Sequence, residues 1–211
     1  MKPKTTFMFF TAVLCWLGLV LQFYLIFTNN TSEVGLWGRF FNFFSFFTIL
    51  TNILVATSLT FSLLKSTSRL GIFFSKPVVH TALAMYILIV GIVYVAVLQG
   101  LWQPQGLQWL VDIILHYAIP ALYTVYWLTF VPKGNTKWKH SLIWLIYPAV
   151  YFIYSLVRGA VTGWYPYPFL DVKLNGFNGT LLNAVVLLGV FVIAGLLFIS
   201  LDRLFSKAFA K

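Results

Sequence analysis

Residues 78–99 read VVHTALAMYILIVGIVYVAVLQ and contain no aspartate, glutamate, lysine or arginine. A run of about 20 apolar residues is long enough to cross the hydrocarbon core of a bilayer as an α-helix, at about 1.5 Å of rise per residue. The apolar residues form a continuous block, without the helix-period or strand-period alternation of an element that faces water on one side. This stretch therefore predicts a transmembrane helix.

Five other blocks have the same character, and together they set the expected fold. Turn-forming and charged residues separate the blocks. We expect an all-α fold, a polytopic membrane bundle of six transmembrane helices that forms a single domain over residues 1–211. The predicted spans lie near 6–28, 40–64, 78–99, 109–131, 140–161 and 179–201.

The composition supports lipid as the solvent around these helices. Of the 211 residues, 61% are hydrophobic and only 9% are charged, whereas a soluble domain carries about 25% charged residues. The net charge of +10 comes from basic residues in the short gaps between apolar blocks. They form no continuous patch of the kind that binds nucleic acid, so we expect no nucleic-acid partner.

The basic residues predict the orientation of the chain. They gather at the ends of the spans that share one side of the membrane, and the positive-inside rule assigns that side to the cytoplasm. Both termini are then cytoplasmic. The residues of this side are Lys2, Lys4, Lys65, Arg69, Lys76, Lys133, Lys137, Lys139, Arg203, Lys207 and Lys211, against Arg39 and Lys173 on the other.

Asp112 and His116 are the ionisable pair that most needs an explanation. A spacing of four residues places both side chains on one face of the fourth span, within reach of each other. Ionisable groups inside a membrane span are costly and are usually functional. The aspartate can hold one imidazole nitrogen and leave the other to act as a general base.

The second span supplies polar side chains at a similar depth. Spacings of three and four place Asn42, Ser45, Thr48 and Asn52 on one stripe, with Thr51 beside it. Thr48 lies about 12 Å and His116 about 10 Å along their helices, so the two can face each other. A hydroxyl, an imidazole and a carboxylate make a nucleophile, a base and an orienting group. Hydrogen bonding between packed helices is the alternative for the stripe.

Three other residues carry charge or chemistry. Arg158, in the fifth span, can extend to the interface, pair with Asp112 or bind a carboxylate headgroup. His80 and His140 lie at cytoplasmic span ends, where we expect ordinary solvated histidines. No metal-ligand spacing and no cofactor-binding motif is present, so we expect neither a metal nor a cofactor.

Residues 162–171, TGWYPYPFLD, carry a family resemblance together with Phe47-Thr48, Leu115-His116 and Pro120. The chain resembles the androgen-induced membrane proteins and their bacterial six-span relatives over nearly its whole length. The animal members hydrolyse fatty acid esters of hydroxy fatty acids with one threonine and one histidine. The resemblance implies Thr48 as nucleophile, with Ser45 one turn away as the alternative, His116 as base, and a bacterial plasma membrane.

The residues and the resemblance together predict a lipid-ester hydrolase that works near the outer leaflet. Membrane lipids or fatty acyl esters would be its substrates, and Asn52 or a neighbouring amide would stabilise the oxyanion. Two alternatives remain. A small-molecule or proton-coupled transporter would use Asp112, His116 and Arg158 as a relay, and a membrane scaffold would have no catalytic activity.

Overall fold

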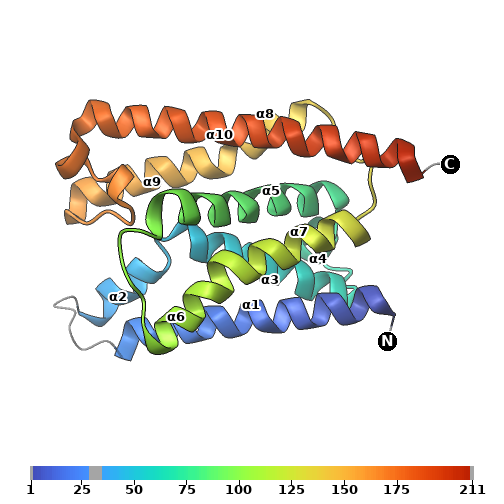
Figure 1. The fold of residues 1–211 in the computed structure, drawn as a ribbon, viewed down its shortest axis with the longest axis horizontal. Coiled ribbons are helices and arrows are strands. Elements are labelled where there is room, and N and C mark those ends of the chain that lie inside the picture. Colours follow the sequence, from blue (N-terminus) through green and yellow to red (C-terminus); the bar gives the residue numbers. More distant parts are fainter. Residues whose placement is uncertain (1, 29–34, 210–211) are drawn as a thin grey trace. The chain divides into compact units, whose positions relative to one another are not determined.

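The chain is mainly helical in the residues that its computed structural model describes, 2–28 and 35–209 (Figure 1). Six helices in these ranges are long and apolar enough to cross a membrane, which confirms the predicted number of spans. Lys211 lies outside the described residues. The six helices are Pro3–Thr28, Phe47–Leu64, Pro77–Leu98, Gly106–Phe130, Lys139–Thr162 and Val172–Lys207.

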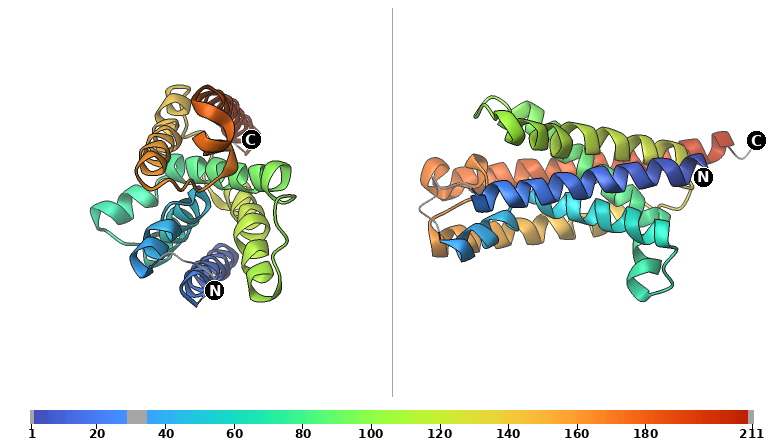
Figure 2. Two further views of the ribbon diagram at one scale, coloured as in Figure 1. Left: turned by 90° about the vertical axis from the view of Figure 1, so that its left-hand side faces the viewer. Right: turned by 90° about the horizontal axis from the view of Figure 1, so that it is seen from below.

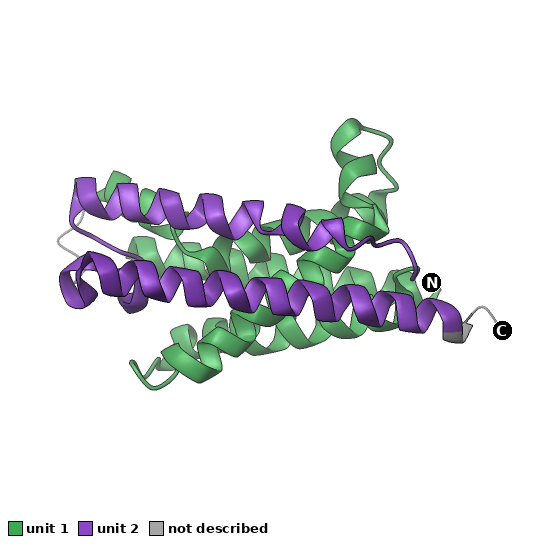
Figure 3. Ribbon diagram, turned by 90° about the horizontal axis from the view of Figure 1, so that it is seen from above, with its two compact units in different colours: residues 1–132 green, residues 133–211 purple. Residues whose placement is uncertain are grey.

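The chain forms two compact units, Met1–Pro132 and Lys133–Lys211 (Figure 3). The expectation of a single domain stays a prediction. Unit 1 contains α1 (Pro3–Thr28), α2 (Leu36–Phe43), α3 (Phe47–Leu64), α4 (Arg69–Phe74), α5 (Pro77–Val93), the π-helix η1 (Tyr94–Leu98), α6 (Gly106–Ile113), the π-helix η2 (Ile114–Ala118) and α7 (Ile119–Phe130). Unit 2 contains α8 (Lys139–Trp144), α9 (Ile146–Thr162), the 3-10 helix η3 (Pro168–Leu170) and α10 (Val172–Phe209).

Unit 1 is a bundle of four spans. Helix α1 packs against α3 and α7, and α5 packs against α3 and α7, so the four close around one core. The left panel of Figure 2 looks along these helices, with α1 in blue and α7 in yellow-green. Helix α1 approaches η2 closely at Gly18, where a Cβ would lie 2.7 Å from the Ile114 side chain. The Trp127 indole is fully buried and donates to Thr81 Oγ1 at 2.9 Å.

The predicted helix over residues 40–64 is wrong in one respect, because it is broken at residues 44–46. Helix α2 ends at Phe43, and Phe46 has an extended backbone (φ −85°, ψ 127°) before α3 begins. In the break, the Ser45 hydroxyl donates to the Phe41 carbonyl at 2.6 Å, a local bond that competes with regular helix. Ser45 therefore does not share a helical stripe with Thr48, which lies in the first turn of α3.

His80 is buried rather than solvated, contrary to the prediction. Its Nδ1 lies 2.8 Å from the Tyr123 hydroxyl and 3.2 Å from Ser58 Oγ, and its Nε2 lies 3.2 Å from Ser62 Oγ. Ser58 and Ser62 are four residues apart, so α3 presents both hydroxyls to one imidazole. Hydrogen bonds at both ring nitrogens allow this ring to be buried in the core of unit 1.

Unit 2 joins two long helices through the loop that follows α9. Helix α10 starts earlier than the predicted 179 and changes direction at Gly176, whose φ of 67° and ψ of 165° suit glycine. Near its other end the fully buried Asp202 accepts hydrogen bonds from the Thr136 amide at 3.0 Å and hydroxyl at 2.7 Å. Partial burial lowers the pKa of Lys133 from 10.5 to about 8, and attraction to Asp202 opposes this shift.

Replacing Asp202 should destabilise unit 2. Asp202→Ala leaves two buried donors of Thr136 without their acceptor, which should cost about 3 kcal/mol of unfolding free energy. Asp202→Asn keeps an acceptor and loses the attraction to Lys133, so its smaller cost should shrink as pH rises through about 8 and Lys133 becomes neutral. Denaturant unfolding in detergent at several pH values measures both effects. Equal stability of the alanine variant and the wild type would contradict this account.

Candidate acid–base site

Asp112 and His116 lie together in unit 1, where the spacing of four residues predicts them. The His116 Nδ1 is 3.1 Å from Asp112 Oδ1 and 3.2 Å from the Asp112 main-chain oxygen. The Asp112 side chain is 5% exposed and that of His116 16% exposed. The carboxylate is therefore almost completely buried, while one edge of the imidazole stays accessible.

Tyr94, which the sequence pattern did not predict as a site residue, completes the site from η1. Its hydroxyl donates to Asp112 Oδ2, and its ring stacks on the His116 ring with centroids 4.0 Å apart and planes 18° apart. The tyrosine thus contacts both members of the pair. It holds the carboxylate at one oxygen and covers one face of the imidazole.

These contacts define the tautomer of a neutral His116. Both groups near Nδ1 are acceptors, a carboxylate oxygen and a main-chain carbonyl, so Nδ1 carries the proton. The lone pair is then on Nε2. Within residues 2–28 and 35–209, the hydrogen bonds and ion pairs of His116 all involve Nδ1. Nε2 is the nitrogen that can accept a proton from a reacting group.

Both helices of the site contain a π-turn at the site itself. The Gln99 amide bonds the Tyr94 carbonyl five residues back, and the Ile119 amide likewise bonds that of Ile114. In the second case Pro120 supplies a cause, because proline has no amide hydrogen and its ring excludes the carbonyl four residues before it. That carbonyl belongs to His116. Single π-turns inside α-helices are frequent at functional sites.

Gly91 allows α5 to approach the backbone of η2. A Cβ at Gly91 would lie 3.0 Å from the His116 main-chain oxygen and 3.2 Å from Pro120 Cβ. Neither neighbour is the free end of a flexible side chain, so neither can move aside at low cost. The stacking of Tyr94, three residues further along, depends on this close approach.

Gly91→Val should therefore separate the two helices at the site. Overpacking of a close helix contact costs about 1–3 kcal/mol, and we expect a lower melting temperature in detergent together with reduced activity in any assay of the site. Gly189→Val is the matched control, because a Cβ at Gly189 meets nothing within 4 Å. An unchanged melting temperature in Gly91→Val would show that the approach is not tight.

Asn52 links α3 to η2. Its fully buried amide donates to the Thr48 carbonyl at 2.9 Å and to the Leu115 carbonyl at 3.4 Å. Its Oδ1 and main-chain oxygen lie 3.5 Å and 3.3 Å from the Cys15 thiol. One side chain thus joins the backbones of Thr48 and of the residue before His116. Both amide hydrogens are engaged, which leaves none for the oxyanion role expected from the sequence.

Arg158 belongs to unit 2, so its expected pairing with Asp112 stays a prediction. Within that unit its guanidinium lies over the Trp164 ring, 4.5 Å from the centroid. A Cβ at Gly159 would collide with the Tyr165 ring, which packs against this turn. His140, also in unit 2, accepts a hydrogen bond from the Lys137 amide at 2.9 Å.

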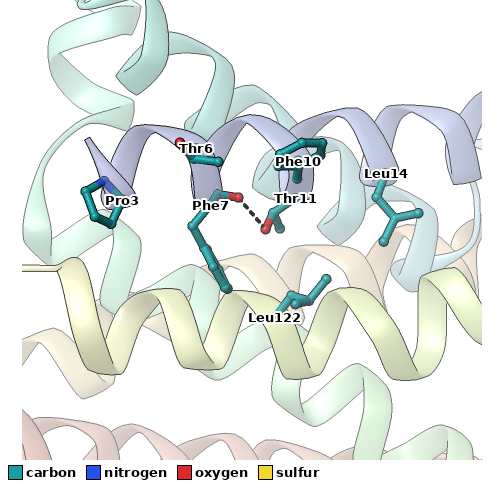
Figure 4. Close-up of a pocket in the computed structure, with 7 residues that line it drawn as sticks. All are labelled: Pro3, Thr6, Phe7, Phe10, Thr11, Leu14 and Leu122. Carbon is teal, nitrogen blue, oxygen red and sulfur yellow. Dashed lines mark hydrogen bonds between the residues drawn. The ribbon is translucent and has the colours of Figure 1, made fainter. Parts of the chain in front are cut away.

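An apolar pocket of about 700 Å³ lies between α1 and α7 in unit 1 (Figure 4). The Thr11 hydroxyl donates to the Phe7 carbonyl at 2.9 Å and so has a partner in its own helix. Leu14 lies one turn from Gly18, where α1 touches Leu115. The lining residues are Pro3, Thr6, Phe7, Phe10, Thr11, Leu14 and Leu122.

In the described part of the chain, no group of three or more His, Cys, Asp or Glu side chains could hold a metal ion. No protein-family model matches the chain, and neither a curated protein nor a solved structure matches it.

Proposed function

We propose that the protein is a lipid-ester hydrolase of the membrane, with His116 as its general base. The observation that carries the proposal is the arrangement around this imidazole. The Asp112 carboxylate lies 3.1 Å from Nδ1, which hydrogen-bonds the Asp112 main-chain oxygen, and Tyr94 stacks on one face of the ring. An imidazole with a carboxylate beside one nitrogen, and with its second nitrogen left for a reacting group, resembles the base of nucleophilic hydrolases.

In the proposed mechanism Thr48 attacks the ester. His116 Nε2 takes the hydroxyl proton, Oγ1 bonds to the ester carbonyl carbon, and Nε2 returns the proton to the alcohol as its C–O bond breaks. Water then attacks the acyl-threonine by the same route and releases the acid. Asn52 is a positioning residue, because it joins the Thr48 backbone to Leu115.

The start of α3 supplies a reason for placing the oxyanion near Thr48. Helix α3 begins at Phe47. The first amides of a helix and its dipole favour negative charge at this end. The helix break at residues 44–46 thus brings the positive end of α3 to the nucleophile, whereas an unbroken helix from residue 40 would not.

The substrate's acyl chain would occupy the apolar pocket between α1 and α7. A lining that is almost entirely apolar suits an alkyl chain. The positive-inside rule places both termini in the cytoplasm and the His116 end of α6–η2 toward the outer leaflet. The resemblance to the androgen-induced membrane proteins also favours this substrate class and a bacterial plasma membrane.

Turnover by the purified protein tests the proposed function. Wild-type protein in nanodiscs should convert a fatty acid ester of a hydroxy fatty acid into two acids, detected by mass spectrometry. The same protein in liposomes should take up no soluble substrate. Uptake without ester cleavage would favour the transporter. A protein that shows neither uptake nor cleavage would favour the non-catalytic scaffold.

Tyr94→Phe tests how the base is positioned. The ring and its stacking remain while the hydrogen bond to Asp112 is lost. A hydrogen bond to a charged group contributes about 1.5–3 kcal/mol to stability, so the melting temperature should fall. In the protein that stays folded, kcat should be about 10- to 100-fold lower with KM nearly unchanged. Tyr117→Phe is the control, since its ring meets Tyr94 edge-on. A fall in melting temperature that accounts for the lost activity would make Tyr94 structural only.

A further inference from the structure

Helix α4, in the connection between α3 and α5, exposes apolar and basic side chains together. Leu70, Ile72 and Phe73 are 61%, 55% and 50% exposed. Its opposite side faces the bundle, where Gly71 is buried and Phe74 stacks on Phe61 with centroids 5.9 Å apart. The exposed residues are therefore the outward face of an amphipathic turn.

Hydrogen bonds hold α4 in this orientation. Ser58 Oγ donates to the Phe74 carbonyl at 2.8 Å, and Ser62 Oγ to Ser75 Oγ at 3.4 Å. The same two serines of α3 contact the buried His80. Ser68 caps α4 by accepting from the Gly71 amide at 3.0 Å. The outward face is thus a fixed feature of unit 1, and the right panel of Figure 2 shows this teal segment standing away from the long helices.

The charge of this segment has one sign. Lys65, Arg69 and Lys76 are exposed around the apolar face, and residues 64–77 contain no aspartate or glutamate. Apolar side chains flanked by basic ones are typical of helices that lie in the interface of an anionic membrane. Each lysine or arginine near such a surface favours binding to anionic lipid.

We propose that α4 is an interfacial helix that binds anionic phospholipid headgroups of the leaflet reached by the ends of α3 and α5. Leu70, Ile72 and Phe73 enter the boundary between headgroups and acyl chains, and Lys65, Arg69 and Lys76 contact the phosphates. The helix is joined within a few residues to two membrane spans, α3 and α5, so the lipid surface is always adjacent. This inference is independent of the proposed hydrolysis.

Spin labelling of the full chain in nanodiscs tests the proposal. Ile72→Cys carries the label, and Cys15 stays in place because it is fully buried; wild-type protein treated with the reagent measures any background. Collision with a water-soluble nickel chelate should fall about twofold or more when phosphatidylglycerol is added to phosphatidylcholine discs. The combined change Lys65→Gln, Arg69→Gln and Lys76→Gln should abolish this dependence on lipid charge.

The combined change Lys137→Gln, Lys139→Gln and Lys207→Gln is the matched control. It removes the same number of exposed charges from unit 2 and should keep the lipid dependence, with the helix content of both variants checked by circular dichroism. A label that is equally accessible to the chelate in both lipid compositions overturns the proposal. A label that stays in water in both lipid compositions would mean that the face is open to a soluble partner. A label that is buried in both compositions would mean that apolar insertion alone holds α4 at the membrane.

Discussion

His116→Gln should lower ester hydrolysis by about 10²- to 10⁴-fold, the usual contribution of a general base. Glutamine keeps polar atoms near Asp112 but has no nitrogen that takes a proton at neutral pH. The side chain is 16% exposed at an edge of the bundle, so the variant should fold. The measurement is kcat/KM for a long-chain ester, with helix content and melting temperature on the same sample.

His140→Gln is the control for His116→Gln. It removes an imidazole from unit 2 that accepts a hydrogen bond from the Lys137 amide and has no part in the proposed chemistry. Full activity is expected. If His116→Gln kept wild-type activity, or if both variants lost activity equally, the imidazole at 116 would not be the base.

The number of spans could be predicted because it depends only on the length and composition of the apolar blocks. Breaks of the helix within an apolar block could not be predicted in this way. The break at residues 44–46 lies in a run of phenylalanines that contains Asn42 and Ser45 but no proline or glycine, so no strong helix breaker marks it. The burial of His80 was missed for a related reason. Its partners Ser58, Ser62 and Tyr123 come from two other helices, and their facing depends on helix rotation.

The same limit explains which parts of the candidate site could be predicted. Asp112 and His116 lie on one helix, and a spacing of four residues determines that they meet. Tyr94 belongs to another helix, and its ring reaches His116 only because Gly91 allows close packing and both helices contain a π-turn. Pro120 was a usable signal for the second π-turn, since proline removes an amide hydrogen bond. No comparable residue marks the first.

Thr48→Ala should reduce turnover about 10³-fold or more, to the rate that binding alone supports. The expectation rests on the Asn52 bridge, which ties the Thr48 and Leu115 carbonyls together. Thr48 is 7% exposed, and loss of one hydroxyl and one methyl there should cost about 1 kcal/mol of stability. Mass spectrometry of wild-type protein quenched during turnover should find the acyl group on the peptide that contains Thr48.

Ser45→Ala distinguishes the two hydroxyls, because Ser45 is the alternative nucleophile. Its Oγ is 2.6 Å from the Phe41 carbonyl in the helix break, and Ser45 is fully buried. We therefore expect Ser45→Ala to lower the melting temperature slightly and to keep most of the activity. An inactive but folded Ser45→Ala, with an active Thr48→Ala, would assign the attack to Ser45. Activity in both single variants and in the double variant would mean that His116 activates water directly, without an acyl-enzyme.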